Sequence, residues 1–460
     1  MNLRIFITSG FLLLSTIPGW SDDATKEDYE ERLDKYDLVA EPEKHRSVAS
    51  WCKRNYPTRY SFHQREYHKH QFLEFEGKMG SSPSTSDLKK ARDFAEKLEL
   101  PDIAKSYHTK WGEVQYAAYA KRLKPGNPKM MKQLLAWAVK EDLSSIPSVK
   151  TLAGSIIEAD SDDLTAREIL GHLKVDGQWT SKENLISKMD PKNIEDRIKT
   201  HKILAKNRIL KERSYSSRPL SGMEELGDFY QFSPRKYPDS KFYLSEKNYS
   251  RTKPCRLIIS LHGGGSGGFQ KASEQAGIAI KSWASANTNE GQIVIAPIAT
   301  KHVVSSWSTL SNVLEIIDAA EEICERFNID RKRIYLTGQS MGGGGTCFWY
   351  LCFPELAAAS VGRTGWFHHD NNKHQDCLSK PILLIQGEKD EAFRIESKDK
   401  FMALAKKVNA NASVITHPDI GHALYWKDQE EDVLNFMAKH VNDIEPDWDV
   451  IRAAAKAWMK

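Results

Sequence analysis

Apolar residues in the C-terminal half of the chain follow two alternating patterns. Short, mostly apolar runs predict buried strands at 241–244, 257–261, 293–296, 334–336, 357–361, 381–385 and 413–415. The stretches between them repeat apolar residues every three or four positions, most clearly over 313–327, which predicts amphipathic helices. Strands that alternate with helices are typical of a parallel sheet covered on both faces, so we expect an α/β fold. The functional groups of such folds gather at the carboxyl ends of the strands.

The N-terminal part, residues 22–205, is polar, rich in charge and helical in its apolar spacing. The segments 48–53 and 135–140 each place a tryptophan in the middle of an apolar stripe. A further helix is predicted around 164–170, followed by a turn at 176–179. Helix pairs with small and aromatic contacts are similar to a degenerate tetratricopeptide-like stack, which implies a spacer or a region that docks a protein partner.

The first 21 residues have the features of a secretory signal. Arg4 is followed by an apolar stretch at 5–17 and then by the small residues Gly19 and Ser21. This stretch is shorter than the roughly 20 apolar residues of a membrane span, so we expect export to the periplasm or medium without stable membrane insertion. After the helical region, a basic and then Ser-, Arg- and Pro-rich stretch predicts a linker at 206–221, which leaves 222–460 as the α/β domain.

The charge of the chain and the spacing of its cysteines and histidines argue against nucleic-acid binding and against a metal site. The net charge of +4 on 460 residues is weak and both signs are mixed along the chain, so we expect no nucleic-acid partner. The six cysteines do not have the paired spacing of a zinc site. Histidines cluster at positions 63, 68 and 70 and again at 368, 369 and 374, but neither group follows an H-E-x-x-H pattern, and we expect both to be solvated surface. We therefore expect no metal at either cluster.

The pentapeptide Gly338-Gln339-Ser340-Met341-Gly342 marks the candidate nucleophile. It has the form G-x-S-x-G, follows the apolar run 334–336 and opens a glycine-rich helix. A serine on a strand-to-helix turn has a strained backbone that small neighbours must permit, and the turn lifts its hydroxyl clear of the sheet. Because an alcohol is a weak nucleophile, Ser340 needs a base beside it.

His422 is the predicted base, since it lies in a loop after the last strand and imidazole titrates near neutral pH. His417, at the end of that strand, is the alternative. The orienting acid should come from the loop after the preceding strand, where Glu388, Asp390 and Glu391 offer carboxylates. The G-x-x-D pattern that recurs in such loops selects Asp390, which would fix the histidine tautomer and stabilise the imidazolium.

A tetrahedral intermediate carries an oxyanion that backbone N–H groups can stabilise. One predicted donor is the N–H of Met341, directly after the nucleophile. The other is predicted in the 262–265 loop, His-Gly-Gly-Gly, which follows a buried strand; Gly264 is favoured and Gly265 is the alternative. Glycines are needed there because the main chain must approach the substrate without an intervening side chain.

Together these residues resemble the secreted esterase branch of the α/β-hydrolase superfamily, with polyhydroxyalkanoate-depolymerase and feruloyl-esterase-like proteins, and more distantly the prolyl-oligopeptidase catalytic domain. The resemblance spans roughly residues 222–445 and rests on the segments 261–265, 328–331, 333–343, 387–390 and 421–422. It implies an α/β-hydrolase fold and hydrolysis of carboxylic esters by a serine through an acyl-enzyme, with no metal or organic cofactor. The same fold and triad also serve thioesters, lactones and peptides, so the substrate is not fixed by it.

The interval between the predicted strands at 357–361 and 381–385 is short. Many lipases place a helical cap there, so we expect an open site in this chain. Trp307, Trp366 and Phe367 are either walls of an acyl or aromatic pocket or ordinary loop anchors. The leading hypothesis is an exported serine esterase acting on an ester substrate such as acylated polysaccharide or polyester. The alternatives are a prolyl-oligopeptidase-like serine peptidase and a non-catalytic binding protein with a helical docking region.

Overall fold

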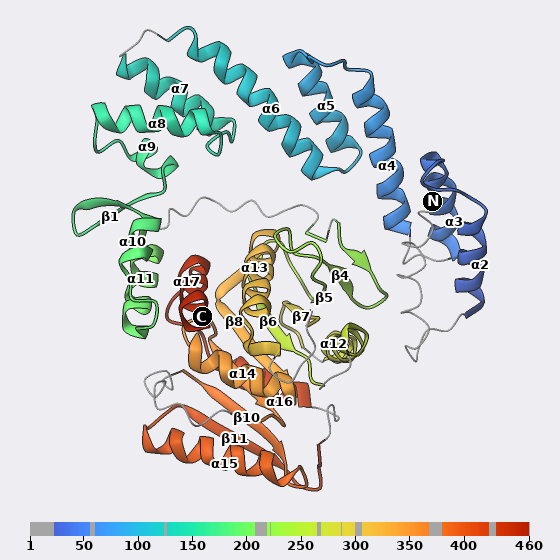
Figure 1. Ribbon diagram of the computed structural model, residues 1–460, viewed down its shortest axis with the longest axis vertical. Coiled ribbons are helices and arrows are strands. Elements are labelled where there is room, and N and C mark those ends of the chain that lie inside the picture. The colour runs from blue at the N-terminus through green and yellow to red at the C-terminus, as the bar shows by residue number, and fades with distance from the viewer. Residues whose placement is uncertain are drawn as a thin grey trace. The chain divides into compact units, whose positions relative to one another are not determined.

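The computed structural model describes most of the chain in two compact units, residues 1–184 and 185–460 (Figure 1). The described residues are 23–55, 60–123, 127–207, 219–220, 222–264, 268–286, 288–299, 306–367, 380–422 and 429–459. The predicted signal segment 1–21 and most of the predicted linker 206–221 lie outside them. The boundary between the units falls earlier in the chain than the predicted boundary at residue 205.

The first unit is built from helices that pack mainly against their neighbours in sequence (Figure 1). They are α2 (Asp23–Asp34), η1 (Pro42–Lys44), α3 (His45–Asn55), α4 (Tyr60–Gly77), α5 (Thr85–Lys97), α6 (Pro101–Ala120), α7 (Pro128–Lys140), α8 (Pro147–Ala159) and α9 (Leu164–Ile169). Proline stands in the first turn of α6, α7 and α8, where its missing N–H costs nothing. A capping box between Ser84 and Asp87 begins α5. The two tryptophan-centred segments lie in α3 and α7, as their apolar spacing predicts.

A short hairpin surrounds the predicted turn at 176–179. Its strands are β1 (His172–Val175) and β2 (Gln178–Ser181), which pair antiparallel with Val175 opposite Gln178. Asp176 and Gly177 both have positive φ, 49° and 82°, which is the backbone that a two-residue type I′ loop requires. The sequence predicted this turn but not its strands, because four-residue strands without a fully buried position leave little apolar pattern.

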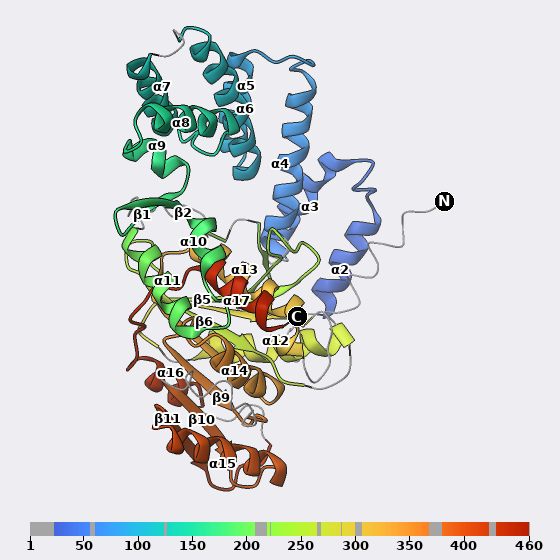
Figure 2. The same cartoon turned by 60° about the vertical axis from the view of Figure 1, so that its left-hand side comes forward.

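The second unit contains a nine-stranded sheet with the order β11-β10-β9-β8-β6-β7-β5-β4-β3. Figure 2 shows its neighbouring strands β10 and β11 beside α15. Strands β6 to β11 all run parallel, and β5, β4 and β3 extend the sheet antiparallel at one edge. Their bounds are β3 (Glu224–Glu225), β4 (Tyr230–Phe232), β5 (Phe242–Lys247), β6 (Cys255–Leu261), β7 (Gln292–Pro297), β8 (Ile329–Gln339), β9 (Ala359–Arg363), β10 (Ile382–Gly387) and β11 (Ala412–His417). Every residue of β6, β7, β9 and β10 is buried, as expected for strands covered on both faces.

Helices cover both faces of this sheet. The second unit's helices are α10 (Lys182–Lys188), α11 (Ile194–Asn207), α12 (Gly268–Ser285), η3 (Ser306–Ser308), α13 (Leu310–Arg326), α14 (Met341–Cys352), α15 (Ala392–Lys407), α16 (Gln429–Met437) and α17 (Trp448–Trp458), α10 starting in the first unit. Residues of α12 and α16 share one apolar core with the sheet, and residues of α13, α14, α15 and α17 pack on the other face. The predicted α/β-hydrolase fold, preceded by a helical region, is confirmed.

Helix α11 packs against the rest of the second unit through a buried ionic group. Arg197 of α11 contacts Glu355 with Nε–Oε1 and Nη2–Oε2 distances of 2.9 and 3.2 Å, and both side chains are almost fully buried. His201, also on α11, accepts a hydrogen bond from the backbone N–H of Asp447 at 3.0 Å. Because Glu355 lies just beyond the C-terminal end of α14, this group ties α11 to the helix that begins directly after Ser340.

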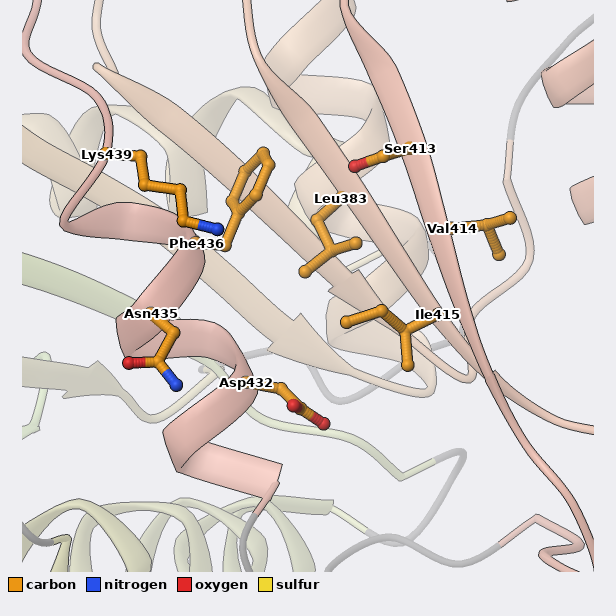
Figure 3. Close-up of a pocket in the computed structure, with 8 residues that line it drawn as sticks. All are labelled: Leu383, Ser413, Val414, Ile415, Asp432, Asn435, Phe436 and Lys439. Atoms are coloured by element: carbon orange, nitrogen blue, oxygen red, sulfur yellow. The ribbon is translucent and has the colours of Figure 1, made fainter.

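A shallow groove of about 280 Å³ lies between α16 and the strands β10 and β11 (Figure 3). It is lined by Leu383, Ser413, Val414, Ile415, Asp432, Asn435, Phe436 and Lys439. None of these is a predicted catalytic residue. Among the described residues, no helix has the length and apolar character needed to cross a membrane.

Candidate active site

Ser340 occupies a tight turn between β8 and α14. Its backbone is strained, with φ 55° and ψ −113°, a conformation that non-glycine residues rarely adopt. The flanking glycines make the turn possible: a Cβ on Gly338 would lie 2.2 Å from the carbonyl oxygen of Gly342, and one on Gly342 would lie 2.0 Å from that of Leu261. The Ser340 N–H donates to the carbonyl of Arg363 at 2.9 Å, which fixes the turn against β9.

The structure brings the three predicted triad residues together. Ser340 Oγ lies 2.9 Å from His422 Nε2. His422 Nδ1 lies 3.0 and 3.2 Å from the two carboxylate oxygens of Asp390. Asp390 is buried, and its side chain reaches the histidine from the loop after β10. This is the geometry in which a carboxylate orients an imidazole whose other nitrogen can take the serine proton.

The alternative residues lie elsewhere. His417 Nε2 is 3.2 Å from a carboxylate oxygen of Asp432, on α16. Glu388 and Glu391 are exposed, and Glu391 pairs with Arg394 at 2.7 Å. The geometry therefore favours His422 and Asp390 over each competitor that the sequence left open.

Two residues that the sequence reasoning did not single out also contact the Asp390 carboxylate. The side-chain amide of Gln386, the fifth residue of β10, donates to Oδ2. The guanidinium of Arg394, on the first turn of α15, lies 3.9 Å from Oδ1. The signal in the sequence was slight: Gln386 is the polar residue that ends the apolar run 382–385.

The loop after β6 is held close to the nucleophile by His262. This imidazole is fully buried: Nδ1 lies 2.7 Å from the carbonyl oxygen of Gly263, and Nε2 accepts the Ala299 N–H at 3.3 Å. Because Nε2 accepts a hydrogen bond, the ring is neutral and Nδ1–H is the donor to Gly263. A Cβ on Gly263 would come within 2.9 Å of the Gln339 carbonyl oxygen, so the loop main chain packs directly on the elbow.

The predicted oxyanion donors follow the residues of this contact along the chain, since Gly264 follows Gly263 and Met341 follows Ser340. Met341 is the first residue of α14, whose leading N–H groups have no partner within the helix. Gly264 has a φ of 103°, which favours glycine over any other residue. Gly265, the alternative donor, lies outside the described residues.

The three aromatic residues near the site have different environments. Trp307 is 1% exposed, packs edge-on against His262 and donates its indole N–H to the His262 carbonyl at 3.0 Å. Phe367 is fully buried, in the core between α14, α15 and the sheet. Trp366 is 53% exposed. Trp307 and Phe367 are therefore anchors of the loops, and of the three only Trp366 offers an open aromatic surface.

The N-terminal histidine group differs from expectation. His63 is 1% exposed, so the prediction of a solvated surface is wrong for this residue. Its Nε2 bonds the Tyr29 hydroxyl at 2.7 Å, and its Nδ1 bonds Nδ1 of His45, also at 2.7 Å. His68 and His70 are half-buried, and the second cluster at 368, 369 and 374 lies outside the described residues.

The described residues contain one group of three side chains with the ligand types and spacing of a metal site. The ligand atoms of Asp390, Glu391 and His422 all lie within 4.8 Å of one another. Both ring nitrogens of His422 already have partners, Ser340 and Asp390. A metal ion at His422 would therefore have to displace one of these hydrogen bonds.

Comparison with known proteins relates the second unit to hydrolases. Residues 293–460, less than half of the chain, match the dienelactone hydrolase family. No curated protein matches the chain. A solved thermostable esterase is 20% identical, with a TM-score of 0.37, over 46% of this chain and 63% of its own length.

Two further solved structures cover nearly the whole of their own chains. A ferulic acid esterase is 14% identical, with a TM-score of 0.37, over 45% of this chain and 95% of its own. The fluorophosphonate-binding serine hydrolase F of Staphylococcus aureus is 15% identical, with a TM-score of 0.36, over 45% and 96%. The family match and the α/β-hydrolase fold described above show that the C-terminal part of the chain is a hydrolase that acts on esters.

Proposed function

We propose that the protein is an exported serine hydrolase that cleaves carboxylic esters through an acyl-enzyme. The observation that carries this proposal is the chain of contacts from Ser340 Oγ through His422 to the buried Asp390 carboxylate. A strained serine, a histidine within hydrogen-bond reach and an orienting carboxylate are the parts that nucleophilic catalysis by an alcohol needs.

In the first half of the proposed reaction, Ser340 Oγ attacks the ester carbonyl carbon while His422 Nε2 takes the hydroxyl proton. The carbonyl oxygen becomes an oxyanion, which accepts hydrogen bonds from the N–H groups of Met341 and Gly264. Asp390 stabilises the positive charge on the imidazolium. The tetrahedral intermediate then breaks its bond to the alkoxy oxygen, His422 returns the proton to that oxygen, and the alcohol leaves an acyl group on Ser340.

The second half repeats these steps with water as the nucleophile. His422 Nε2 takes a proton from a water molecule as its oxygen attacks the acyl carbon. The second tetrahedral intermediate releases Ser340, whose oxygen regains the proton from His422, and the acid departs. No group beyond the triad and the oxyanion donors is required to balance either half-reaction.

We propose an open site that takes a bulky ester, such as acylated polysaccharide or polyester. Two observations support this: only residues 364–381 separate β9 from β10, and Trp366 at the start of that interval is exposed. An open entrance suits an acyl group attached to a polymer better than the long chains of an emulsified lipid. Turnover of long-chain emulsified lipid as fast as that of short soluble esters would contradict the proposal.

Hydrolysis of short-chain p-nitrophenyl esters by the mature protein tests the chemistry. We expect release of p-nitrophenol by the native protein and its loss in Ser340→Ala. Equal activity in both would show that the nucleophile is misassigned. For export, we expect the mature protein to begin at residue 22, because small residues stand at Gly19 and Ser21; mass spectrometry that finds residues 1–21 retained would contradict the cleavage.

A further inference from the structure

We propose that Gln386 is a positioning residue for the catalytic acid: its side-chain amide fixes the orientation of the Asp390 carboxylate toward His422. The inference rests on the proposed function, because Asp390 matters only if the triad is the catalytic group. Gln386 itself acts through Asp390 and touches neither Ser340 nor His422 among the hydrogen bonds of the described residues.

A glutamine at this buried position destabilises the fold unless its amide makes a hydrogen bond. Gln386 is fully buried in β10, between β9 and β11, and the four residues before it in the strand are buried and apolar. Burying an amide without a compensating hydrogen bond destabilises the folded protein. Among the described residues, the Gln386 side chain makes one hydrogen bond, the donation to Asp390 Oδ2. Strand β10 therefore places a buried hydrogen-bond donor, the Gln386 amide, beside the Asp390 carboxylate.

The two carboxylate oxygens of Asp390 have different supports. The backbone N–H of Glu391 donates to Oδ1 at 2.7 Å, and the amide of Gln386 donates to Oδ2. His422 Nδ1 bridges both oxygens at 3.0 and 3.2 Å. Rotation of the carboxylate about Cβ–Cγ would break the bond to Gln386, so this amide fixes the plane in which Asp390 meets the imidazole.

The chemistry of the amide sets its orientation. Its nitrogen must face Asp390, because the amide oxygen would repel a carboxylate at this distance. The Gln386 oxygen has no hydrogen-bond partner among the described residues. Among the described residues, no other hydrogen bond competes with the one from the Gln386 amide to Asp390. An apolar side chain of similar length would fill the same space but could not donate this hydrogen bond.

Few charges surround the acid. The titratable and charged groups of the described residues that face it are His422 from the following loop, and Glu391 and Arg394 from the start of α15. Lys389 pairs with Asp419 on the exposed outer side of the loop. Without the Gln386 donor, the Asp390 carboxylate would attract the protonated imidazole of His422 more strongly. As the pH falls, the base would then be lost at a higher pH than in the native protein.

The variant Gln386→Met tests the proposal, since it keeps the length of the side chain and removes the donor. With a p-nitrophenyl ester we expect kcat to fall on the order of 10- to 100-fold, as for a misplaced catalytic group, with KM unchanged. We also expect the acid limb of the kcat/KM profile to move to higher pH. Native values of kcat and an unmoved profile would overturn the proposal.

Gln386→Glu gives a second readout that does not depend on Gln386→Met folding well. A carboxyl beside Asp390 can donate only while it is protonated, and two ionised carboxylates at this distance repel each other. Activity should therefore decline as the pH rises through the titration of this pair, a loss that the native protein does not show. A profile with the same shape as that of the native protein would overturn the proposal.

Gln292→Met is the matched control. Gln292 is also a fully buried amide in a strand, at the start of β7 and so at the end of the sheet away from the catalytic loops, where its oxygen accepts from Arg256 at 3.2 and 3.1 Å. It should lose stability but keep the native pH profile. If it shifts the profile as Gln386→Met does, the effect is general loosening and the positioning role is wrong. Ser340→Ala separates the two claims: activity retained there contradicts the proposed function, and activity lost there with a native Gln386→Met contradicts this inference alone.

Discussion

At the residue scale, the site depends on a few side chains whose positions the backbone enforces. Ser340 is held in a strained conformation by glycines that leave no space for a Cβ, and its hydroxyl meets His422. His262 also helps to position the site, because its ring fixes the loop that carries Gly264. The reactive groups are thus arranged before any ester binds, which is how such sites avoid the cost of reorganisation during the reaction.

Neutralising the acid should remove most of the activity. In Asp390→Asn the side chain no longer favours the imidazolium or the required tautomer, so we expect kcat to fall by about 10⁴-fold, the size seen for the acid of serine-protease triads. Glu388→Gln is the control, because Glu388 is exposed in the same loop and makes no contact with His422 among the described hydrogen bonds. Steady-state hydrolysis of a p-nitrophenyl ester measures both. If Glu388→Gln lost as much activity as Asp390→Asn, Asp390 would be wrongly assigned as the catalytic acid.

The sequence could predict Ser340, His422 and Asp390 as candidates because order along the chain and glycine spacing are local signals. Gln386 could not be found in this way, since nothing in the run 382–387 says which polar side chain will face an acid four residues later. The sequence also could not show whether the three aromatic residues line a pocket or anchor loops. Only the packing shows that Trp307 and Phe367 are anchors and that Trp366 is exposed. His63 was misjudged for the same reason, because its partners Tyr29 and His45 are far away in sequence.

At the element scale, long apolar runs were predictable and short or late elements were not. Strands β6, β7 and β10 are buried on both faces, so their sequences are almost continuously apolar. The two-residue β3 and three-residue β4 are too short to carry a pattern. Helix α17, which packs Trp448 and Ile451 into the core, was not among the predicted elements. The sequence assigns α11 to the N-terminal region because the helix is rich in charged residues. Nothing in its sequence indicates that Arg197 forms a buried ion pair with Glu355.

The buried pair of α11 should be important for stability. Arg197→Met removes the cation and leaves the Glu355 carboxylate in a fully buried site, and breaking such a pair costs about 3–5 kcal/mol. Chemical denaturation of the second unit measures this loss. The double variant Arg197→Met with Glu355→Leu should recover much of it, because no buried charge is left without a partner. Unchanged stability in Arg197→Met would contradict the role given to α11.

The helical unit should lose stability in acid because of His45. Burial is the main cause that lowers the pKa of His45 below its usual 6.5; nearby His70 adds to this and Glu66 opposes it. A lowered pKa in the folded state means that the unfolded chain binds the proton more tightly. The stabilising contribution is therefore complete above about pH 6.5 and is lost as the pH falls toward the folded-state value.

Calorimetry of the full-length protein between pH 7.5 and 5 would show this as a falling midpoint for the first unit. His45→Gln keeps a polar group that can hydrogen-bond His63 but does not titrate, so its midpoint should fall less steeply. A native midpoint that rises on acidification would contradict the effect of burial on His45.

At the scale of the whole molecule, the two units have separate hydrophobic cores and all the proposed catalytic residues belong to the second. Clusters around Tyr116, Leu135 and Phe72 fill the first unit, whereas those of the second unit centre on the sheet. The role that the sequence suggests for the helical unit, a spacer or a region that docks a protein partner, stays a prediction. The sequence predicted the two-part organisation from the change in texture, although the contacts place α11 with the second part.

A chain without residues 22–184 should therefore retain hydrolysis of small esters. We expect kcat and KM for a p-nitrophenyl ester to stay within about twofold of the full-length values, because among the described residues every hydrogen-bond partner of the triad belongs to the second unit. The same chain tested on insoluble polyester or acylated polysaccharide would reveal any contribution of the first unit to large substrates. Loss of small-ester activity, although the shortened chain still unfolds cooperatively, would contradict the separation.

If Ser340 is the nucleophile, it carries an acyl group during turnover, and mass spectrometry can detect that group. The mature protein is mixed with a p-nitrophenyl ester, quenched in acid during turnover, and its intact and peptide masses are compared with those of Ser340→Ala. We predict an increase of one acyl group on the peptide that contains Ser340, absent from the variant. Turnover with no acylated peptide and with an active Ser340→Ala protein would contradict the account.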